Sequence, residues 1–227
     1  MKNAKPFSFY LSIVLCIVVI FLTTMVLYLN SKQNPLQKTI NKYFPSAVEI
    51  IVSDSNGNKA YGSGLVLDNT HIISAAHMFE TANSVSVKFY DETTFPATVL
   101  KIDTEIDLAL LEFSCLDKTF PKIDFTTKQS IQFGEEIVKF GNALNYGLSV
   151  DQGIISNPYK RIEIGETLRE LVQISIDICG GDSGGAVFNN KGQLIGIISF
   201  KTSSAIATDR ELSFAVPGWI VADFVQN

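Results

Sequence analysis

The longest apolar segment of the chain lies near its N-terminus, where residues 6–31 contain no Asp, Glu, Lys, Arg or His. A helix rises about 1.5 Å per residue, so residues 7–29 are long enough for a hydrocarbon core of about 30 Å. The pattern predicts a transmembrane helix over 7–29, after a tail at 1–6. A cleaved secretory signal is the alternative. A signal ends in a small-x-small site, whereas residues 28–31 read Tyr-Leu-Asn-Ser, which favours a retained anchor.

Residues 30–46 form a polar linker after this segment. Leu36, Ile40 and Phe44 recur at a spacing of four, which fits either a short amphipathic helix or a flexible tether. Lysines flank the apolar segment on both sides, so the charge pattern does not fix the orientation of the helix in a membrane.

Beyond the linker, residues 47–227 show short runs rich in Val, Ile, Phe and Tyr, separated by turn signals. About a dozen strands are predicted, at 48–52, 64–67, 72–75, 85–90, 97–102, 108–113, 136–140, 149–156, 171–178, 185–188, 194–200 and 212–216. Helical periodicity appears only after Pro217, where apolar residues predict a C-terminal helix. Many short strands with little helix favour an all-β barrel or sandwich and disfavour a parallel α/β sheet.

Composition narrows the function without identifying it. The chain has 18 basic and 23 acidic residues and a net charge of −5, which argues against a nucleic-acid partner. Of its three cysteines, Cys16 lies in the apolar segment, so Cys115 and Cys179 are expected to be free thiols rather than a disulfide framework. No cluster of His, Cys and carboxylate residues has the spacing of a metal site, and no cofactor or metal is predicted.

The strongest chemical signal is the run Gly180-Gly181-Asp182-Ser183-Gly184-Gly185. Glycines permit positive φ, so backbone N–H groups of such a loop are able to point into one small space beside the exposed Ser183 hydroxyl. That geometry supplies a nucleophile and an oxyanion-stabilising group together. The alternative is a plain glycine hairpin whose Ser and Asp make local turn bonds.

A serine nucleophile needs a base, and the chain has two histidines. His77 follows an apolar run and small residues at the end of a strand, whereas His71 lies in a polar turn. Asp107 directly precedes the apolar run 108–111, where a buried carboxylate requires a partner. The run around Ser183 also fits G-x-S-x-G of α/β-hydrolases, but no histidine follows it. The order His77, Asp107, Ser183 is that of chymotrypsin-like proteases.

In order along the chain, these motifs resemble the signatures of trypsin-like serine peptidases, nearest the bacterial HtrA group. They are Ser-Ala-Ala-His at 74–77, Asp-Leu-Ala-Leu-Leu at 107–111, Gly-Asp-Ser-Gly-Gly at 181–185 and Ser-Phe-Ala-Val-Pro at 213–217. The resemblance implies two six-stranded antiparallel β-barrels within a peptidase domain at 47–227.

The resemblance also implies roles for residues. Ser183 would be the nucleophile, His77 the general base and acid, and Asp107 the residue that orients His77. The N–H groups of Gly181 and Ser183 would form the oxyanion hole. By the same resemblance Ser199, Phe200 and Lys201 would lie along the cleft and bond the substrate backbone as an added strand.

Some features depart from the family pattern. HtrA proteins usually carry a PDZ domain after the peptidase, and this chain stops at Asn227. Asp182 precedes the nucleophile as in trypsins, where it pairs with a new N-terminus that is not evident here. An unpaired Asp182 would hold the oxyanion loop inactive until an effector binds. Asp177 has the spacing of the trypsin pocket aspartate, which predicts a preference for Lys or Arg before the scissile bond; a surface acid paired locally is the alternative.

Taken together, the sequence predicts a single-pass, membrane-anchored serine endopeptidase that hydrolyses protein or peptide substrates. The HtrA analogy places its peptidase domain outside the cytoplasm, on a bacterial cytoplasmic membrane. The alternatives are a catalytically silent or effector-gated binding module on the same fold, and a secreted protease whose N-terminal segment is removed. The sequence contains no signal of oligomeric state.

Overall fold

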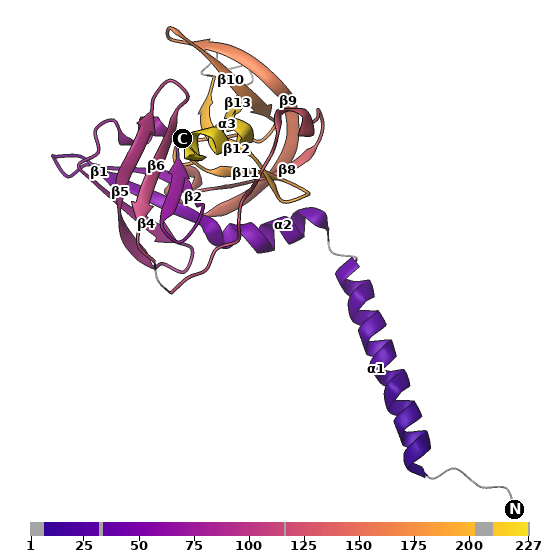
Figure 1. The fold of residues 1–227 in the computed structure, drawn as a ribbon. Coiled ribbons are helices and arrows are strands. Elements are labelled where there is room, and N and C mark those ends of the chain that lie inside the picture. Colours follow the sequence, from indigo (N-terminus) through magenta and orange to yellow (C-terminus); the bar gives the residue numbers. More distant parts are fainter. Residues whose placement is uncertain (1–6, 32–33, 116, 203–210, 227) are drawn as a thin grey trace, which may run out of the picture.

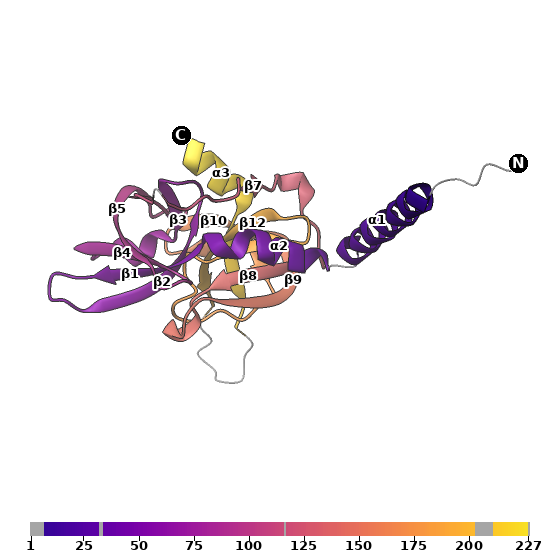
Figure 2. The same cartoon turned by 90° about the horizontal axis from the view of Figure 1, so that it is seen from below.

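The computed structural model describes residues 7–31, 34–115, 117–202 and 211–226. Two β-barrels form the body of the molecule, and an N-terminal helix extends away from them in both views (Figures 1 and 2). This helix, α1 (Phe7–Ser31), is apolar enough over Ser8–Tyr28 to cross a membrane, and that stretch is not buried in the protein. Its hydroxyl groups bond back to the helix, as when Ser12 Oγ donates to Ser8 O at 2.9 Å.

A second short helix, α2 (Pro35–Tyr43), joins α1 to the barrels (Figure 1). The Asn34 side chain caps it by accepting a hydrogen bond from Leu36 N at 3.0 Å, and Pro35 stands in the first turn, where its missing N–H costs nothing. Leu36 and Tyr43 are buried, and Tyr43 stacks on Phe188 with the ring centroids 4.5 Å apart. The linker therefore contains an amphipathic helix packed on the body.

The first barrel closes in the order β1-β2-β3-β6-β5-β4, with all neighbours antiparallel. Its core follows the period-two alternation of strands, as in β4, where Val85, Val87 and Phe89 are buried and the residues between them are not. Its strands are β1 (Ala47–Ser53), β2 (Lys59–Val66), β3 (His71–Ser74), β4 (Ser84–Phe89), β5 (Thr94–Asp103) and β6 (Leu108–Phe113).

The second barrel follows the order β11-β8-β9-β10-β13-β12 and is closed by pairing of β11 with β12. The short strand β7 (Asp124–Phe125), which the sequence pattern did not predict, adds to β12 in parallel. The other strands are β8 (Glu136–Gly141), β9 (Ser149–Ile164), β10 (Thr167–Ile174), β11 (Ala186–Asn189), β12 (Gln193–Lys201) and β13 (Ser213–Pro217), and helix α3 (Gly218–Gln226) follows them. The predicted fold class is confirmed.

Three predicted strand limits in this barrel are wrong. The strand expected to end at Ile178 ends as β10 at Ile174, where its pairing with β9 and β13 ends. The strand expected to end at Ser156 continues as β9 to Ile164, because Pro158 falls where the register with β10 shifts, and a bulge tolerates a residue without an N–H. The next strand, β10, begins at Thr167 rather than Leu171, because Gly165, with a φ of +61°, allows a two-residue hairpin turn.

A shared apolar core joins the two barrels. Leu65, Ile73 and Leu108 of the first barrel belong to the same buried cluster as Phe140 and Ile197 of the second. Burial at this seam fixes the ends of β3 and β6 relative to β8 and β12, so side chains at those ends are held in a defined geometry.

Candidate active site

His77 lies at the seam, immediately after β3. It belongs to a single 3₁₀ turn, Ala76–Phe79, which follows the buried residue Ala75. Its side chain remains 41 % exposed. Nδ1 lies 3.0 Å from both carboxylate oxygens of Asp107, and the backbone N–H of His77 donates to Asp107 Oδ1 at 3.0 Å. Three contacts with one carboxylate therefore fix the orientation of the ring.

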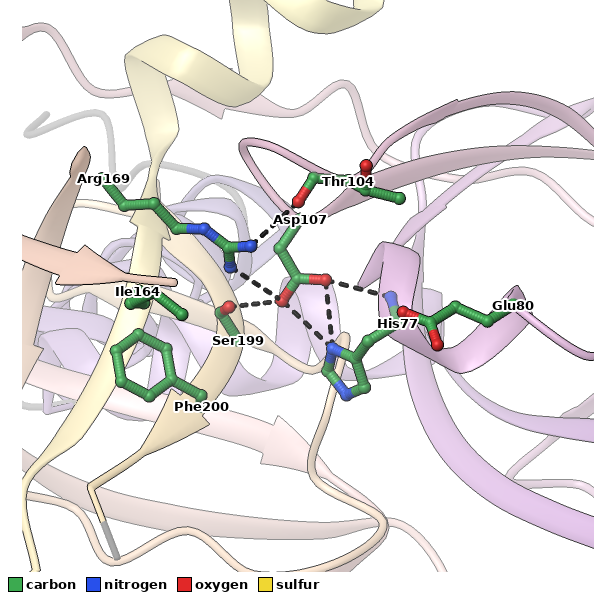
Figure 3. Close-up of a pocket in the computed structure, with 8 residues that line it drawn as sticks. All are labelled: His77, Glu80, Thr104, Asp107, Ile164, Arg169, Ser199 and Phe200. Atoms are coloured by element: carbon green, nitrogen blue, oxygen red, sulfur yellow. Dashed lines mark hydrogen bonds and ion pairs between the residues drawn. The ribbon is translucent and has the colours of Figure 1, made fainter. Parts of the chain in front are cut away.

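Asp107 occupies the residue before β6 and is 4 % exposed. Its φ of +61° lies in the left-handed region, which turns the carboxylate toward His77 rather than along the strand. Ser199 Oγ donates to Asp107 Oδ2, and Arg169 Nη1 lies 3.9 Å from the same oxygen (Figure 3). Burial opposes ionisation of this carboxyl group, but the contacts with His77 and Ser199 outweigh it and hold the pKa of Asp107 below its usual value.

Ser183 completes the line of contacts from the second barrel. It lies in the loop between β10 and β11, and its Oγ is 2.9 Å from His77 Nε2. The structure thus brings Ser183, His77 and Asp107 together, with each histidine nitrogen facing one partner. Nδ1 faces the carboxylate, so the neutral ring that carries its proton there leaves Nε2 free to accept the hydroxyl proton.

The glycine loop has a conformation that only glycine accepts. Gly181 has a φ of +96°, and a Cβ on it would lie 2.1 Å from Asn142 O. Gly184 has a φ of +83°, and a Cβ there would lie 2.2 Å from Ser63 O. Glycine at these two positions therefore permits both the positive φ and the close approach of the neighbouring backbone.

Hydrogen bonds to two carbonyl groups orient the N–H groups of this loop. Gly180 O accepts from Leu144 N at 2.7 Å, and Asp182 O accepts from Gly185 N at 2.9 Å. In a trans peptide the C=O and N–H point in opposite directions, so the N–H groups of Gly181 and Ser183 point away from these donors. Across the part of the chain that the structure describes, neither of these two N–H groups meets an acceptor. They are two free donors on either side of Asp182.

Asp182 has a partner that the sequence analysis missed. Its side chain is fully buried, and Oδ2 lies 2.8 Å from Nζ of Lys139, whose side chain is 1 % exposed. The sequence identified no partner for Asp182, and in the structure that partner is Lys139. Lys139 lies between buried apolar residues of β8, and a lysine inside such a run was the signal that a buried carboxylate would be found opposite it.

The residues predicted to bind substrate occupy different environments. Ser199 is 2 % exposed, and its hydroxyl bonds Asp107. Phe200 lines a cavity of about 320 Å³ together with His77, Asp107 and Arg169 (Figure 3). Lys201 is exposed and forms an ion pair with Glu211. The pairing of β12 with β11 ends at Ile197, so the backbone at 199–201 is not covered by β11.

The remaining candidate residues lie apart from this line of contacts. Asp177 is exposed. The hydrogen bond that Lys201 donates to Glu211 is the main cause that raises the pKa of Lys201, and the negative charge of Asp177 makes a smaller contribution in the same direction. His71 is the first residue of β3, and its Nδ1 contacts Asp68 of the preceding turn at 3.0 Å. It is not part of the site.

The sequence analysis assigned no role to two residues that support the site. Arg169 Nη2 donates to Thr104 O at 2.8 Å, which places the guanidinium against the Asp107 carboxylate (Figure 3). Ser63 Oγ donates to Gly181 O at 2.7 Å and accepts from Asn142 N at 2.8 Å. These contacts join residues far apart in sequence, so local pattern does not reveal them.

Two barrels with a Ser-His-Asp arrangement at their seam define the class of trypsin-like serine peptidases. Comparison with known families agrees: a family model described as a trypsin-like peptidase domain matches residues 62–197. The chain belongs to the trypsin-like peptidase family.

Among its relatives, the Serine endoprotease DegS of Salmonella typhimurium is 34 % identical over 163 residues, covering 70 % of this chain and 45 % of that protein. A Probable periplasmic serine endoprotease DegP-like of Rickettsia conorii is 27 % identical over 197 residues, covering 83 % of this chain and 38 % of that protein. This chain therefore spans less than half the length of these relatives. The solved HtrA-type protease AlgW with tripeptide has a TM-score of 0.74 at 24 % identity, covering 83 % of this chain and 61 % of that one. The predicted resemblance to the HtrA group is confirmed.

Proposed function

We propose that this protein is a serine endopeptidase that hydrolyses peptide bonds of protein substrates through Ser183, His77 and Asp107. The observation that carries the proposal is the continuous line of contacts from Asp107 through both nitrogens of His77 to Ser183 Oγ. Family membership and the names of the relatives support the same activity.

The geometry supports a two-step acyl transfer. His77 Nε2 takes the Ser183 hydroxyl proton while Oγ bonds the substrate carbonyl carbon, and the negative oxygen that forms accepts from the N–H groups of Gly181 and Ser183. The C–N bond then breaks as His77 returns the proton to the leaving amine. In the second step His77 takes a proton from water, the hydroxide attacks the ester, and Ser183 regains its proton. Asp107 stays ionised and stabilises the charged imidazole.

The lengths of the elements support a membrane anchor. Helix α1 is long enough to span a bilayer, and only residues 32–34 separate its end from α2, which is packed on the body. The peptidase domain would therefore lie close to the membrane surface. One of the relatives is named periplasmic, which supports a peptidase domain outside the cytoplasm of a bacterium.

A fluorophosphonate probe tests the activity and the placement together. Ser183 Oγ attacks phosphorus, fluoride leaves and His77 takes the proton, so we expect a covalent adduct on Ser183 that disappears in Ser183→Ala. In cells that express the full chain, a membrane-impermeant probe is expected to label intact spheroplasts, with the adduct retained in carbonate-washed membranes. An adduct formed only after lysis would contradict the sidedness. The absence of a Ser183-dependent adduct would contradict the proposed activity, and the binding module would then be the remaining interpretation.

The binding-module alternative has lost the observation that favoured it. That interpretation depended on Asp182 having no evident partner, and the structure pairs this carboxylate with Lys139. No other contact of the described residues favours a silent site over an active one.

We also propose that Asp177 favours Lys or Arg before the scissile bond. Asp177 lies six residues before Ser183, and its carboxylate is exposed, so a substrate cation is able to reach it. Among matched peptides, those with Lys or Arg are expected to be cleaved up to about fivefold faster than those with Ala or Val, as one exposed ion pair allows. Asp177→Asn should remove that ratio. Equal rates for the four peptides, or an unchanged ratio in the variant, would refute this preference.

A further inference from the structure

The residue between the two free N–H groups of the loop belongs to a buried ion pair. Asp182 is the residue between Gly181 and Ser183, and both its side chain and that of Lys139 are buried. An ionised group loses its hydration on burial, and a partner at 2.8 Å offsets that loss only while both members are present. Removing the lysine would leave a buried carboxylate without a counter-charge.

The Asp182 carboxylate is held on one side only. Oδ2 accepts from Lys139 Nζ, from the backbone N–H of Cys179 at 3.0 Å and from Cys179 Sγ at 3.5 Å. Oδ1 is buried without a donor among the described residues, and it packs so closely on Gly141 that a Cβ there would lie 2.4 Å away. The position of this side chain therefore depends on three donors, of which only Lys139 carries charge.

The loop has few other side chains to hold it. Glycines occupy positions 180, 181, 184 and 185, so Asp182 and Ser183 alone have side chains there, and the Ser183 side chain faces His77. Because the Asp182 side chain is fully buried, its carboxylate would reach solvent only if the backbone also moved, and that movement would reorient the peptide units on both sides of Asp182. Those units carry the N–H groups of Gly181 and Ser183.

We propose that Lys139 is a positioning residue that keeps the oxyanion hole assembled in the uncleaved chain, by supplying from inside β8 the cation that Asp182 requires. The inference rests on the proposed peptidase activity. It means that neither a newly formed N-terminus nor an effector has to supply that cation. Lys139 Nζ also lies 2.9 Å from Asp151 Oδ2, but the Asp151 side chain is 48 % exposed and solvent is able to replace it.

The test compares variants of the full chain in detergent with one peptide substrate. In Lys139→Met we expect kcat to fall about 100-fold with KM nearly unchanged, the effect of losing one oxyanion donor. Affinity for a peptidyl trifluoromethyl ketone, which mimics the tetrahedral state, should fall by the same factor. Adding Asp182→Asn to Lys139→Met removes the unpaired buried charge. The kcat of this double variant should be at least about tenfold higher than that of Lys139→Met. Asp151→Asn is the matched control, because its carboxylate is half exposed, and should stay within about threefold of wild type.

Rescue separates a charge effect from a packing effect. If Lys139 only filled space, neutralising Asp182 would not restore activity. A folded Lys139→Met with wild-type kcat, or a double variant as inactive as the single one, would overturn the inference. If Lys139→Met does not fold, the double variant is compared with Asp182→Asn; activity within about threefold supports the inference, and a deficit beyond tenfold overturns it.

Two further measurements distinguish a failure of this inference from a failure of the proposed peptidase activity. The labelled wild type should have the mass of the uncleaved chain plus the probe, and labelling confined to a cleaved form would overturn the inference alone. A wild type that neither cleaves peptides nor reacts with the probe would overturn the proposed activity, and this inference with it.

Discussion

Replacing His77 by alanine is expected to lower kcat/KM for a peptide substrate by about 10⁶-fold, and Ser183→Ala by a similar factor, as in another serine protease. Without Nε2 at 2.9 Å from Oγ, the hydroxyl keeps its proton and is a poor nucleophile. Because the two groups act in one proton transfer, the double variant should lose no more than either single variant. The measurement is steady-state cleavage of one fluorogenic peptide by all three variants.

The second histidine provides a matched control for this prediction. His71 begins β3 and contacts Asp68 of the preceding turn, away from Ser183 and Asp107. His71→Ala should therefore keep kcat/KM within about threefold of wild type, since surface substitutions away from special contacts have small effects. Losses that add in the double His77→Ala and Ser183→Ala variant would show that the two residues do not act as a unit.

Much of the site was predictable because its chemistry depends on local residue types. The glycines around Ser183, the apolar strand behind Asp107 and the small residues before His77 each appear as short patterns in the sequence. Their order along the chain then excluded the α/β-hydrolase arrangement. The structure agrees with those patterns because each loop conformation depends on its own residues, as the positive φ of Gly181 does.

The supporting contacts were not predictable in the same way. Lys139 meets Asp182 only because β8 pairs with β11, and Ser63 reaches Gly181 only because the two barrels share a core. Strand pairing across such distances is set by the tertiary fold, and a local pattern does not specify the partner. A buried lysine predicts that a carboxylate lies opposite it, but it does not identify that carboxylate.

The Asp107→Asn variant is expected to fold like the wild type and to lose about 10⁴-fold in kcat at neutral pH. Asparagine tolerates the left-handed region in which Asp107 lies, with a φ of +61°, and its carbonyl oxygen in place of Oδ1 still accepts from the backbone N–H of His77. Its amide donates toward His77 Nδ1, however, which places the imidazole proton on Nε2. That nitrogen then donates to Ser183 and is unable to take its proton.

Alanine at this position is a poorer probe than asparagine. Asp107→Ala would remove the acceptor of the His77 backbone N–H and place a residue that avoids positive φ at the start of β6. A loss of activity in that variant would mix unfolding with chemistry. Unchanged thermal unfolding of Asp107→Asn, together with the loss of kcat, separates the two.

The same variant tests the lowered pKa of Asp107 through stability. A carboxyl group with a pKa below its unfolded value stabilises the fold above that unfolded value, about 3.9 for Asp, and loses this contribution as the pH falls through the folded value. The unfolding free energy of the wild type minus that of Asp107→Asn should thus be constant from pH 7 to about pH 5. It should decrease below about pH 4, because only the wild type loses this contribution. Urea unfolding along a pH series measures it. A difference that stays constant down to about pH 2 would show that the folded state does not favour the ionised form of Asp107.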